Sequence, residues 1–292
     1  MRGLALIILC TTLMGCSGKQ PAKIPVESLP QQVKPLTMAI VMDDYTVNKL
    51  QAALALHAAV PDIDKGRAIE LLSQTFLETP YVANRLIGSA TTAEQLVIDF
   101  RGVDCFTYLD YVQALRTATS ENEFVENVIQ TRYINGDVSF QQRKHFFTDW
   151  AHTRQILADD VTAQLSPHAV TVVKQLNRKA DGELYLPGIA VTERSVTYIP
   201  SEFIDEQVIS QLQTGDYIGI YTKLAGLDVT HTGFFIMTQN GPVLRHASSR
   251  PESHKVMDSA FASYVLNTPG IVVYGRADRR VMSYKKLCLT RI

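Results

Sequence analysis

Two hydrophobic periodicities follow one another along this chain, and their order restricts the possible folds more than any other feature. In the first half, apolar residues recur every three or four positions, as in Leu50, Ala53 and Leu54, which is the spacing of an amphipathic helix. In the last third, short β-branched and aromatic runs between turn residues are typical of strands. Helices followed by a mostly antiparallel sheet predict an α+β fold. The expected strands in this last third are 217–220, 232–237, 243–244 and 271–274.

The helical part divides into several segments. Two amphipathic helices are expected on either side of Pro61, the second one through Ile69, Leu72 and Phe76. They form an N-terminal helical layer. Further elements are expected as a strand at 96–98, a helix beginning at Asp104-Cys105 and running through Leu115, and helices at 121–133 and 166–176.

The N-terminus has the order of a secretory signal. Arg2 precedes a short apolar run at 4–9, which is too short to span a bilayer. The run ends in Leu13-Met14-Gly15-Cys16, which resembles the lipobox of bacterial lipoproteins. The resemblance implies a signal peptide at 1–15 and a lipid anchor on Cys16. A plain secretion signal that happens to contain a cysteine is the alternative.

By resemblance to sorting in Gram-negative cells, Ser17 after the cysteine favours the outer membrane, with the protein facing the periplasm. Residues 16–36 contain four prolines among Lys, Gln and Ser, so this stretch reads as an extended tether. The length that remains, 37–292, is compatible with one decorated domain or two. We interpret it as one catalytic domain with an N-terminal helical extension.

Composition excludes some partners. A net charge of −1 with 46% hydrophobic residues is typical of an ordinary globular protein and argues against a nucleic-acid binder. The metal-binding pattern His-Glu-x-x-His and the serine hydrolase pattern Gly-x-Ser-x-Gly are both missing from the sequence. We therefore expect no metal or other cofactor.

The four cysteines have different fates under this interpretation. Cys10 is removed with the signal and Cys16 is acylated, which leaves Cys105 and Cys288 in an oxidising compartment where they could form a disulfide. Cys288 lies between two leucines, a context typical of an inert buried thiol. We prefer two free thiols.

Cys105 is a candidate nucleophile because it is expected at a helix N-terminus with Asp104 as the N-cap. A helix N-terminus facing a histidine lowers the pKa of a thiol and favours the reactive thiolate. A lone cysteine on an apolar helix face is more often part of the core. Whether Cys105 is a nucleophile or a core residue therefore depends on a base elsewhere in the sequence.

Two histidines provide that support. His231 opens one expected strand and His246 closes the next, so each lies at the open end of one hairpin. One imidazole can take the thiol proton while the second orients it. A tight turn at Asn240-Gly241 would leave the two rings about four residues out of register. Pro242 argues against that turn, so we predict a wider loop centred near 238–239.

Six segments of the chain together resemble a known family of cell-wall enzymes. Asp104-Cys105, the paired histidine strands and Gly215-Asp216 resemble the NlpC-type papain-like peptidases, and more closely the N-acetylmuramoyl-L-alanine amidase-like family. The resemblance extends from about Thr79 to Tyr274. Its segments are TPYVANRLIGS, DCFTYLDYVQAL, RKHFFTDW, TYIP, GDYIGIYTKLAGLDVTHTGFFI and HASS.

The resemblance implies a papain-like fold and a peptidoglycan substrate, with Cys105, His231 and His246 as the catalytic set. It places Tyr81 near the sulfur, and Asp104 next to the nucleophile in the substrate-facing set. The resemblance also implies that a family pattern of Arg, His, Asp and Trp lines the cleft. In this sequence the pattern corresponds to Arg143, His145, Asp149 and Trp150. Tyr81 and Trp150 would then be flat surfaces on which a sugar can stack.

A structural reading of the last group is equally open, with Trp150 in the core and Arg143 paired to Asp149. The bond that is cut is also open. The amidase-like family implies the bond between muramic acid and L-alanine, whereas NlpC-type enzymes at large imply a stem-peptide endopeptidase acting between D-glutamate and the diamino acid. A catalytically inactive peptidoglycan-binding lipoprotein is a further alternative.

Overall fold

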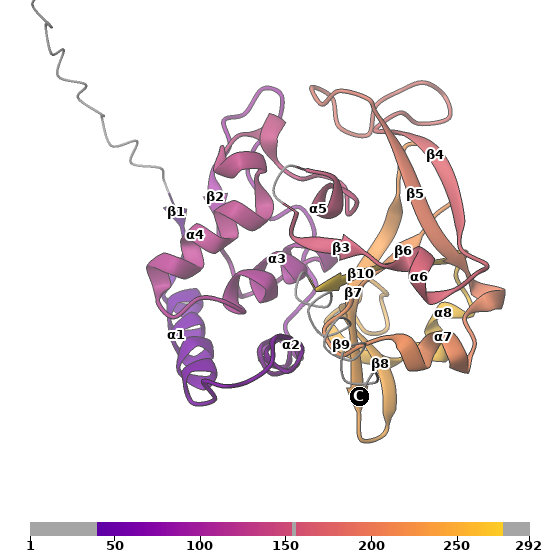
Figure 1. Cartoon of the computed structure of the whole chain (residues 1–292). Coiled ribbons are helices and arrows are strands. Elements are labelled where there is room, and N and C mark those ends of the chain that lie inside the picture. Colours follow the sequence, from indigo (N-terminus) through magenta and orange to yellow (C-terminus); the bar gives the residue numbers. More distant parts are fainter. Residues whose placement is uncertain (1–39, 154–155, 277–292) are drawn as a thin grey trace, which may run out of the picture. The chain divides into compact units, whose positions relative to one another are not determined.

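The computed structural model describes residues 40–153 and 156–276. The expected signal peptide, the lipidated Cys16, the tether and Cys288 all lie outside these residues. The described part has the expected mixed α+β architecture, in which helices precede a mostly antiparallel sheet. Figure 1 shows the helices α1 to α4, in indigo to magenta, beside the orange strands. No helix among the described residues is both long and apolar enough to cross a membrane.

Two capped helices follow the short strand β1 (Ile40–Val41), and both helices were predicted. α1 spans Asp44–Ala58 and α2 spans Lys65–Gln74. The Asp43 carboxylate accepts a hydrogen bond from the Thr46 N–H at 2.9 Å, and Asp64 caps α2 in the same way. Each cap satisfies an N–H group that a first helical turn leaves free. The strands β1 and β2 (Leu96–Val97) flank the two helices in the sequence and pair as a two-stranded parallel sheet.

α3 is the central helix of the domain. It spans Cys105–Leu115, and all its residues from Thr107 onwards are buried. A helix that is buried on every side lies inside a core rather than on its surface. α4 (Glu121–Arg132) packs beside it. The shorter helices are η1 (Ile134–Gly136), η2 (Phe140–Gln142), α5 (Asp149–His152), α6 (Thr162–Leu165), η3 (Ser201–Phe203), α7 (Glu206–Gln211) and α8 (Phe261–Val265).

The large sheet is antiparallel throughout its described pairs, with the order β4-β5-β10-β6-β7-β8-β9 and β3 paired to β10. Its strands are β3 (Ala158–Asp160), β4 (Val170–Leu176), β5 (Thr192–Pro200), β6 (Tyr217–Tyr221), β7 (Val229–Thr238), β8 (Gly241–Ala247), β9 (Val256–Ala260) and β10 (Gly270–Arg276).

Alternate residues of the strands serve two separate cores. Phe234 of β7 packs edge-on against Tyr108 of α3, with ring centroids 5.4 Å apart. Its neighbour Phe235 faces the other side of the sheet and packs against Phe261 of α8 at 5.0 Å. This two-residue alternation is the normal consequence of strand geometry. The sheet therefore separates the α3 core from a smaller core under α8.

The helix expected at 166–176 is wrong, because this stretch contains strand β4. Its run Val170-Thr171-Val172-Val173 is β-branched, and such side chains lose rotamer freedom in a helix but pack well on a sheet. β4 pairs along its whole length with β5, from Val170 opposite Tyr198 to Leu176 opposite Thr192. The preference for a strand is thus reinforced by partner residues 16 to 28 positions further along the chain.

A buried ion pair fixes α3 to its surroundings. Arg132 donates from Nε to the Asp110 carboxylate at 2.8 Å and from Nη1 to the Val97 carbonyl at 2.7 Å. Both charged side chains are 1% exposed. Removing one partner would leave the other charge buried and unpaired, which is far more costly than the loss of a surface pair.

We therefore expect Arg132→Met to lower the free energy of unfolding by roughly 3–5 kcal/mol. The exposed Arg67, whose side chain is 61% accessible, provides a matched control. Arg67→Met should change the same quantity by less than about 0.5 kcal/mol. Urea unfolding followed by circular dichroism measures both variants. Similar midpoints for the two would show that the buried pair does not stabilise α3.

Candidate active site

Cys105 is the first residue of α3, as the sequence predicted, and its half-buried thiol is free. The Asp104 carboxylate accepts from the N–H groups of Phe106 at 3.1 Å and Thr107 at 2.7 Å. The Thr107 hydroxyl in turn accepts from the Asp104 N–H at 3.0 Å, which completes a capping box. The cap holds the helix start, and therefore the sulfur, in a fixed position.

A hydrogen bond joins the start of α3 to the strand that carries His231. The hydroxyl of Thr232 donates to the carbonyl of Cys105 at 2.9 Å. Thr232 is the next residue after His231 in β7 and is 2% exposed. The candidate nucleophile and the candidate base thus come from segments more than 120 residues apart that are bonded directly to each other.

The hairpin β7–β8 has a different register from the one predicted. Thr238 pairs with Gly241, so only Gln239 and Asn240 form the turn, and the expected wider loop is wrong. Pro242 is accommodated opposite Met237, because the pairing of β8 with β9 begins only at the next residue. The turn is tight but lies one position earlier than Asn240-Gly241.

This register makes the two histidines diagonal neighbours on one face of the hairpin. Phe234 pairs with Arg245, so the same register places Gly233 opposite His246. A Cβ added at Gly233 would lie 2.9 Å from the Cβ of His246 and 2.8 Å from the Arg245 carbonyl oxygen. The glycine two residues after His231 therefore gives His246 the room to approach.

The histidines form one hydrogen-bonded chain. His231 Nε2 lies 2.7 Å from His246 Nδ1, and the two rings are nearly perpendicular. His246 Nε2 lies 3.0 Å from the Ser259 hydroxyl. If His231 carries its proton on Nε2 and donates to His246, then His246 is protonated on its own Nε2 and donates to Ser259. This assignment leaves Nδ1 of His231 free to accept a proton.

Burial keeps these groups neutral. Burial, followed by the neighbouring His246 and Arg250, lowers the pKa of His231 to about 3, and burial together with Arg250 lowers the pKa of His246 to about 4. Burial, with a smaller contribution from Asp104, raises the pKa of the Cys105 thiol to about 11. The lowered thiol pKa expected from the helix N-terminus is therefore opposed by desolvation. The resting site holds a thiol and a neutral imidazole.

Tyr81 lies near the sulfur, as the family resemblance implies. Its ring packs 5.3 Å from that of His254, and its N–H donates to the His254 carbonyl at 2.9 Å. Burial, followed by interaction with Cys105 and Asp104, raises the pKa of Tyr81 to about 12. The phenol is thus neutral beside the thiol and is available as a hydrogen-bond donor.

Three site residues were missed by sequence reasoning. Ser259 ends the histidine chain, the ring of Tyr264 lies 5.0 Å from that of His246, and the Arg250 guanidinium lies 5.1 Å from the centre of the Tyr264 ring. Ser259 and Tyr264 come from β9 and α8, and only the fold brings them to the histidines. Arg250 directly follows the segment HASS, and this adjacency was the one available signal.

The expected cleft residues Arg143 and His145 have partners within the protein. Arg143 donates from Nε to Glu94 at 3.0 Å and also bonds it through Nη2, while Tyr133 donates to the same carboxylate at 2.7 Å. His145 Nε2 lies 2.8 Å from the Phe140 carbonyl. The bonds to Glu94 join the segment after α4 to the loop before β2, and the His145 contact holds that segment together, so both residues have structural roles.

Asp149 and Trp150 also have structural positions. Asp149 pairs with Arg194 of β5 at 2.9 Å, so the alternative pairing of Asp149 with Arg143 is wrong. Trp150 is fully buried and packs against Phe106 and Tyr217. Its burial excludes the expected role as a stacking surface for a sugar and confirms the core reading.

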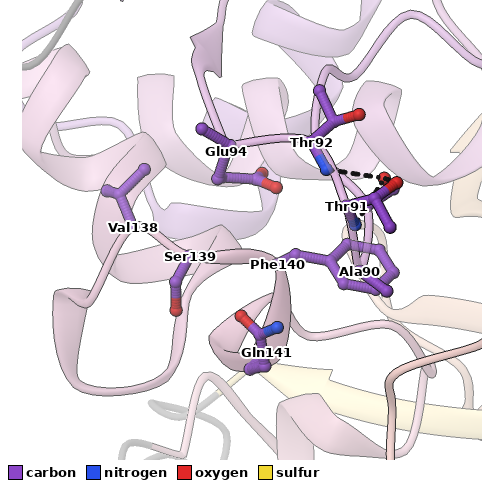
Figure 2. A pocket seen from close by; sticks show the side chains of 10 residues that line it. Ala90, Thr91, Thr92, Glu94, Val138, Ser139, Phe140 and Gln141 are labelled. Carbon is purple, nitrogen blue, oxygen red and sulfur yellow. Dashed lines mark hydrogen bonds between the residues drawn. The ribbon is translucent and has the colours of Figure 1, made fainter.

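A pocket of about 480 Å³ lies on the Glu94 side of this arrangement. Figure 2 shows Thr91 and Thr92 on one side of it and Val138 and Ser139 on the other, with Glu94 between them. Arg143 and His145 do not line the pocket themselves, but they hold Glu94 and Phe140, which do. Among the described residues, no group of three or more His, Cys, Asp or Glu is placed to hold a metal ion.

Solved structures similar to this one come from several bacteria. A Legionella pneumophila protein of the DUF1460 family is 23% identical, with a TM-score of 0.65, over 79% of this chain and 95% of that one. At this identity the similarity supports the fold alone. A Bacteroides uniformis N-acetylmuramoyl-L-alanine amidase is 27% identical, with a TM-score of 0.61, over 73% and 98%. A Bacteroides fragilis protein described as a candidate xylanase is 27% identical, with a TM-score of 0.57, over 70% and 98%.

No curated protein matches this chain. The family model AmiA-like, described as N-acetylmuramoyl-L-alanine amidase-like, matches residues 71–271. This range contains Cys105, both histidines, Ser259 and Tyr264, and it covers well over half of the 292 residues. The chain therefore belongs to the N-acetylmuramoyl-L-alanine amidase-like family.

Proposed function

We propose that this protein is a cysteine-dependent peptidoglycan hydrolase that cleaves the amide bond between N-acetylmuramic acid and L-alanine. The observation that carries the proposal is the hydrogen-bonded chain from Ser259 through His246 to His231. Thr232, the residue after His231, bonds directly to Cys105 at the N-terminus of α3. Membership of the amidase-like family and the similarity to the Bacteroides uniformis amidase support the choice of bond.

The chemistry follows from this chain of groups. Nδ1 of His231 takes the thiol proton as the sulfur attacks the lactyl carbonyl carbon. The carbon–nitrogen bond then breaks, and His231 returns the proton to the L-alanine amine, which leaves. Water attacks the resulting thioester, again with His231 as base, and releases the muramic acid carboxylate and the thiol. His246, held by Ser259, stabilises the transient imidazolium of His231.

Two further features fit the developing negative charge. The N-terminus of α3 places positive partial charge beside the carbonyl oxygen during attack. Tyr81 is a neutral donor near the sulfur.

A cysteine on a helix that packs against histidines of an antiparallel sheet supports the placement in the NlpC-type papain-like superfamily.

Two alternative activities differ in how well their chemistry matches this site. A xylanase, as one similar protein is described, requires two carboxylates across the scissile bond. Asp104 here is used as a helix cap, and the groups around Cys105 are a hydroxyl, phenols and imidazoles. A stem-peptide endopeptidase would use the same thiol and histidines, so only the product distinguishes it from the amidase.

The proposal includes the location of the protein. The lipobox-like Leu13-Met14-Gly15-Cys16 supports removal of residues 1–15 and acylation of Cys16. The proline-rich stretch 16–36 would then tether a domain at 37–292 to the outer membrane, where peptidoglycan is within reach on the periplasmic side.

The first prediction concerns the nucleophile and the bond. Cys105→Ala should reduce hydrolysis of a muropeptide by about a thousandfold or more, since no thioester can form. Mass spectrometry of wild-type products should find a peptide with a free L-alanine amino terminus and a disaccharide without peptide. Cys288→Ala is the matched control and should retain activity.

Two results would contradict this prediction. A new amino terminus on the diamino acid, with L-alanyl-D-glutamate still attached to the sugar, would identify the endopeptidase. Full activity of Cys105→Ala would remove the cysteine mechanism altogether.

The second prediction concerns pH. His231 must be neutral to accept the thiol proton, and its lowered pKa keeps it neutral well into the acid range. Activity should therefore fall only below the ordinary histidine pKa of 6.5, as pH decreases toward the lowered value. The kcat/KM profile measures this limb. A half-maximal point at or above 6.5 would show that the histidine pKa is not lowered.

The raised pKa of the Cys105 thiol allows a second, independent test of the neutral resting site. Alkylation of the resting enzyme by iodoacetamide should be slow at neutral pH and should accelerate as pH rises toward about 11. Rapid alkylation of Cys105 below neutral pH would reveal a preformed thiolate instead.

The third prediction concerns the anchor. Cys16→Ser removes the acylated side chain, so the protein should move from the membrane fraction to the soluble periplasmic fraction. The intact protein, fractionated in parallel, is the control. An unchanged membrane fraction for the variant would refute the lipid anchor.

A further inference from the structure

Arg250 is an exposed cation near the histidine chain. Its loop follows β8 and is held by its own hydrogen bonds: the Arg250 carbonyl accepts from the N–H groups of Ser253 at 3.0 Å and His254 at 2.8 Å. The hydroxyls of Ser248 and Ser253 lie 2.7 Å apart, and the Ser248 N–H donates to the Lys255 carbonyl at 2.9 Å. The backbone that presents the guanidinium is thus well defined.

The guanidinium lies over an aromatic ring of the site. It is 5.1 Å from the centre of the Tyr264 ring, and that ring lies 5.0 Å from the His246 ring and 6.3 Å from the His231 ring. Arg250 is exposed, and within 40–153 and 156–276 its guanidinium forms no ion pair. Its planar set of N–H donors is therefore available to a ligand from solvent.

The positive charge of Arg250 opposes catalysis unless an anion binds to its guanidinium. The charge of Arg250 lowers the pKa of both histidines and so disfavours the imidazolium that forms on His231 during proton transfer. An anionic group bound to the guanidinium would neutralise this effect at the moment when the substrate is in place. A carboxylate suits the geometry best, because it accepts two parallel N–H bonds from arginine.

We propose that Arg250 binds a free carboxylate of the stem peptide, namely the α-carboxylate of its D-glutamate. The inference rests on the proposed amidase function. On the sugar side of the scissile bond, the only carboxyl carbon of muramic acid is the one under attack. A free carboxylate near the reaction must therefore belong to the leaving peptide. In a stem joined through the γ-carboxyl of D-glutamate, the nearest one is the α-carboxylate of its second residue.

Arg250 is then a specificity-determining residue for the leaving peptide. It would select stems with a free D-glutamate carboxylate over stems in which this group is amidated, because the amide carries no charge and offers one oxygen. A charge-assisted bidentate contact corresponds to roughly a 10- to 100-fold difference in kcat/KM.

The experiment uses two muramoyl tripeptides that differ only in an α-carboxylate or α-carboxamide on the γ-linked D-glutamate. The wild-type enzyme should cleave the acid about 10- to 100-fold better than the amide. Arg250→Gln should lower kcat/KM for the acid to the level of the amide and remove the preference. The control Arg67→Gln, which changes an exposed side chain of α2, should keep the preference. Equal rates of the two substrates with the wild-type enzyme would overturn the proposal.

A second measurement separates this inference from the proposed function. The Cys105→Ala protein, titrated with the two free tripeptides, should bind the acid more tightly, and the additional change Arg250→Gln should remove that difference. This holds whether or not the muramoyl bond is cut. Equal binding of both tripeptides would refute the carboxylate site while leaving the amidase untouched.

The pH profile shows whether Arg250 acts through charge. Without its cation the histidines become more basic, so the acid limb of Arg250→Gln should move to higher pH. Arg250→Lys, which keeps the charge, should retain the wild-type limb. An unchanged limb in Arg250→Gln would refute the charge effect of Arg250 on the histidines, while the substrate preference and the tripeptide titration decide the carboxylate site.

Discussion

The hydrogen bond between His231 and His246 is the interaction on which the candidate site depends. The bond forms in the register that places Gly233 opposite His246. This register requires glycine at position 233, because any side chain there would collide with His246. The register, in turn, depends on the two-residue turn at Gln239-Asn240. A shift of one residue would move alternate side chains to the other face of the sheet and separate the imidazoles.

The helix layer brings the proposed nucleophile, Cys105, to this hairpin. α3 is held at its start by the capping box of Asp104, in its middle by the buried pair of Asp110 and Arg132, and against β7 by Thr232. Burial that stabilises this arrangement also raises the pKa of the thiol and lowers that of the histidines. Under the proposed mechanism, proton transfer therefore takes place between a neutral thiol and a neutral imidazole when substrate arrives, rather than within a standing ion pair.

Local patterns predicted the class of the fold and the start of α3, because helical periodicity, an N-cap aspartate and β-branched runs act over a few residues. The same patterns failed where partners distant in sequence decide: β4 is a strand alongside β5, Arg143 pairs with Glu94, and Trp150 is enclosed by Phe106 and Tyr217. Ser259, Tyr264 and Arg250 reach the histidines from separate elements with no motif of their own. Only the tertiary fold brings such residues to the site.

The protonation pattern of the histidine chain tests this account most directly. Nitrogen-15 spectra of the resting enzyme with labelled histidine, assigned with His231→Ala and His246→Ala, distinguish the two neutral tautomers from the imidazolium. At neutral pH we expect both histidines to be neutral and protonated on Nε2, with Nδ1 of His231 free to accept the thiol proton. An imidazolium at His231, or a proton on its Nδ1, would contradict the proposed role of His231 as the base of a neutral thiol–imidazole site.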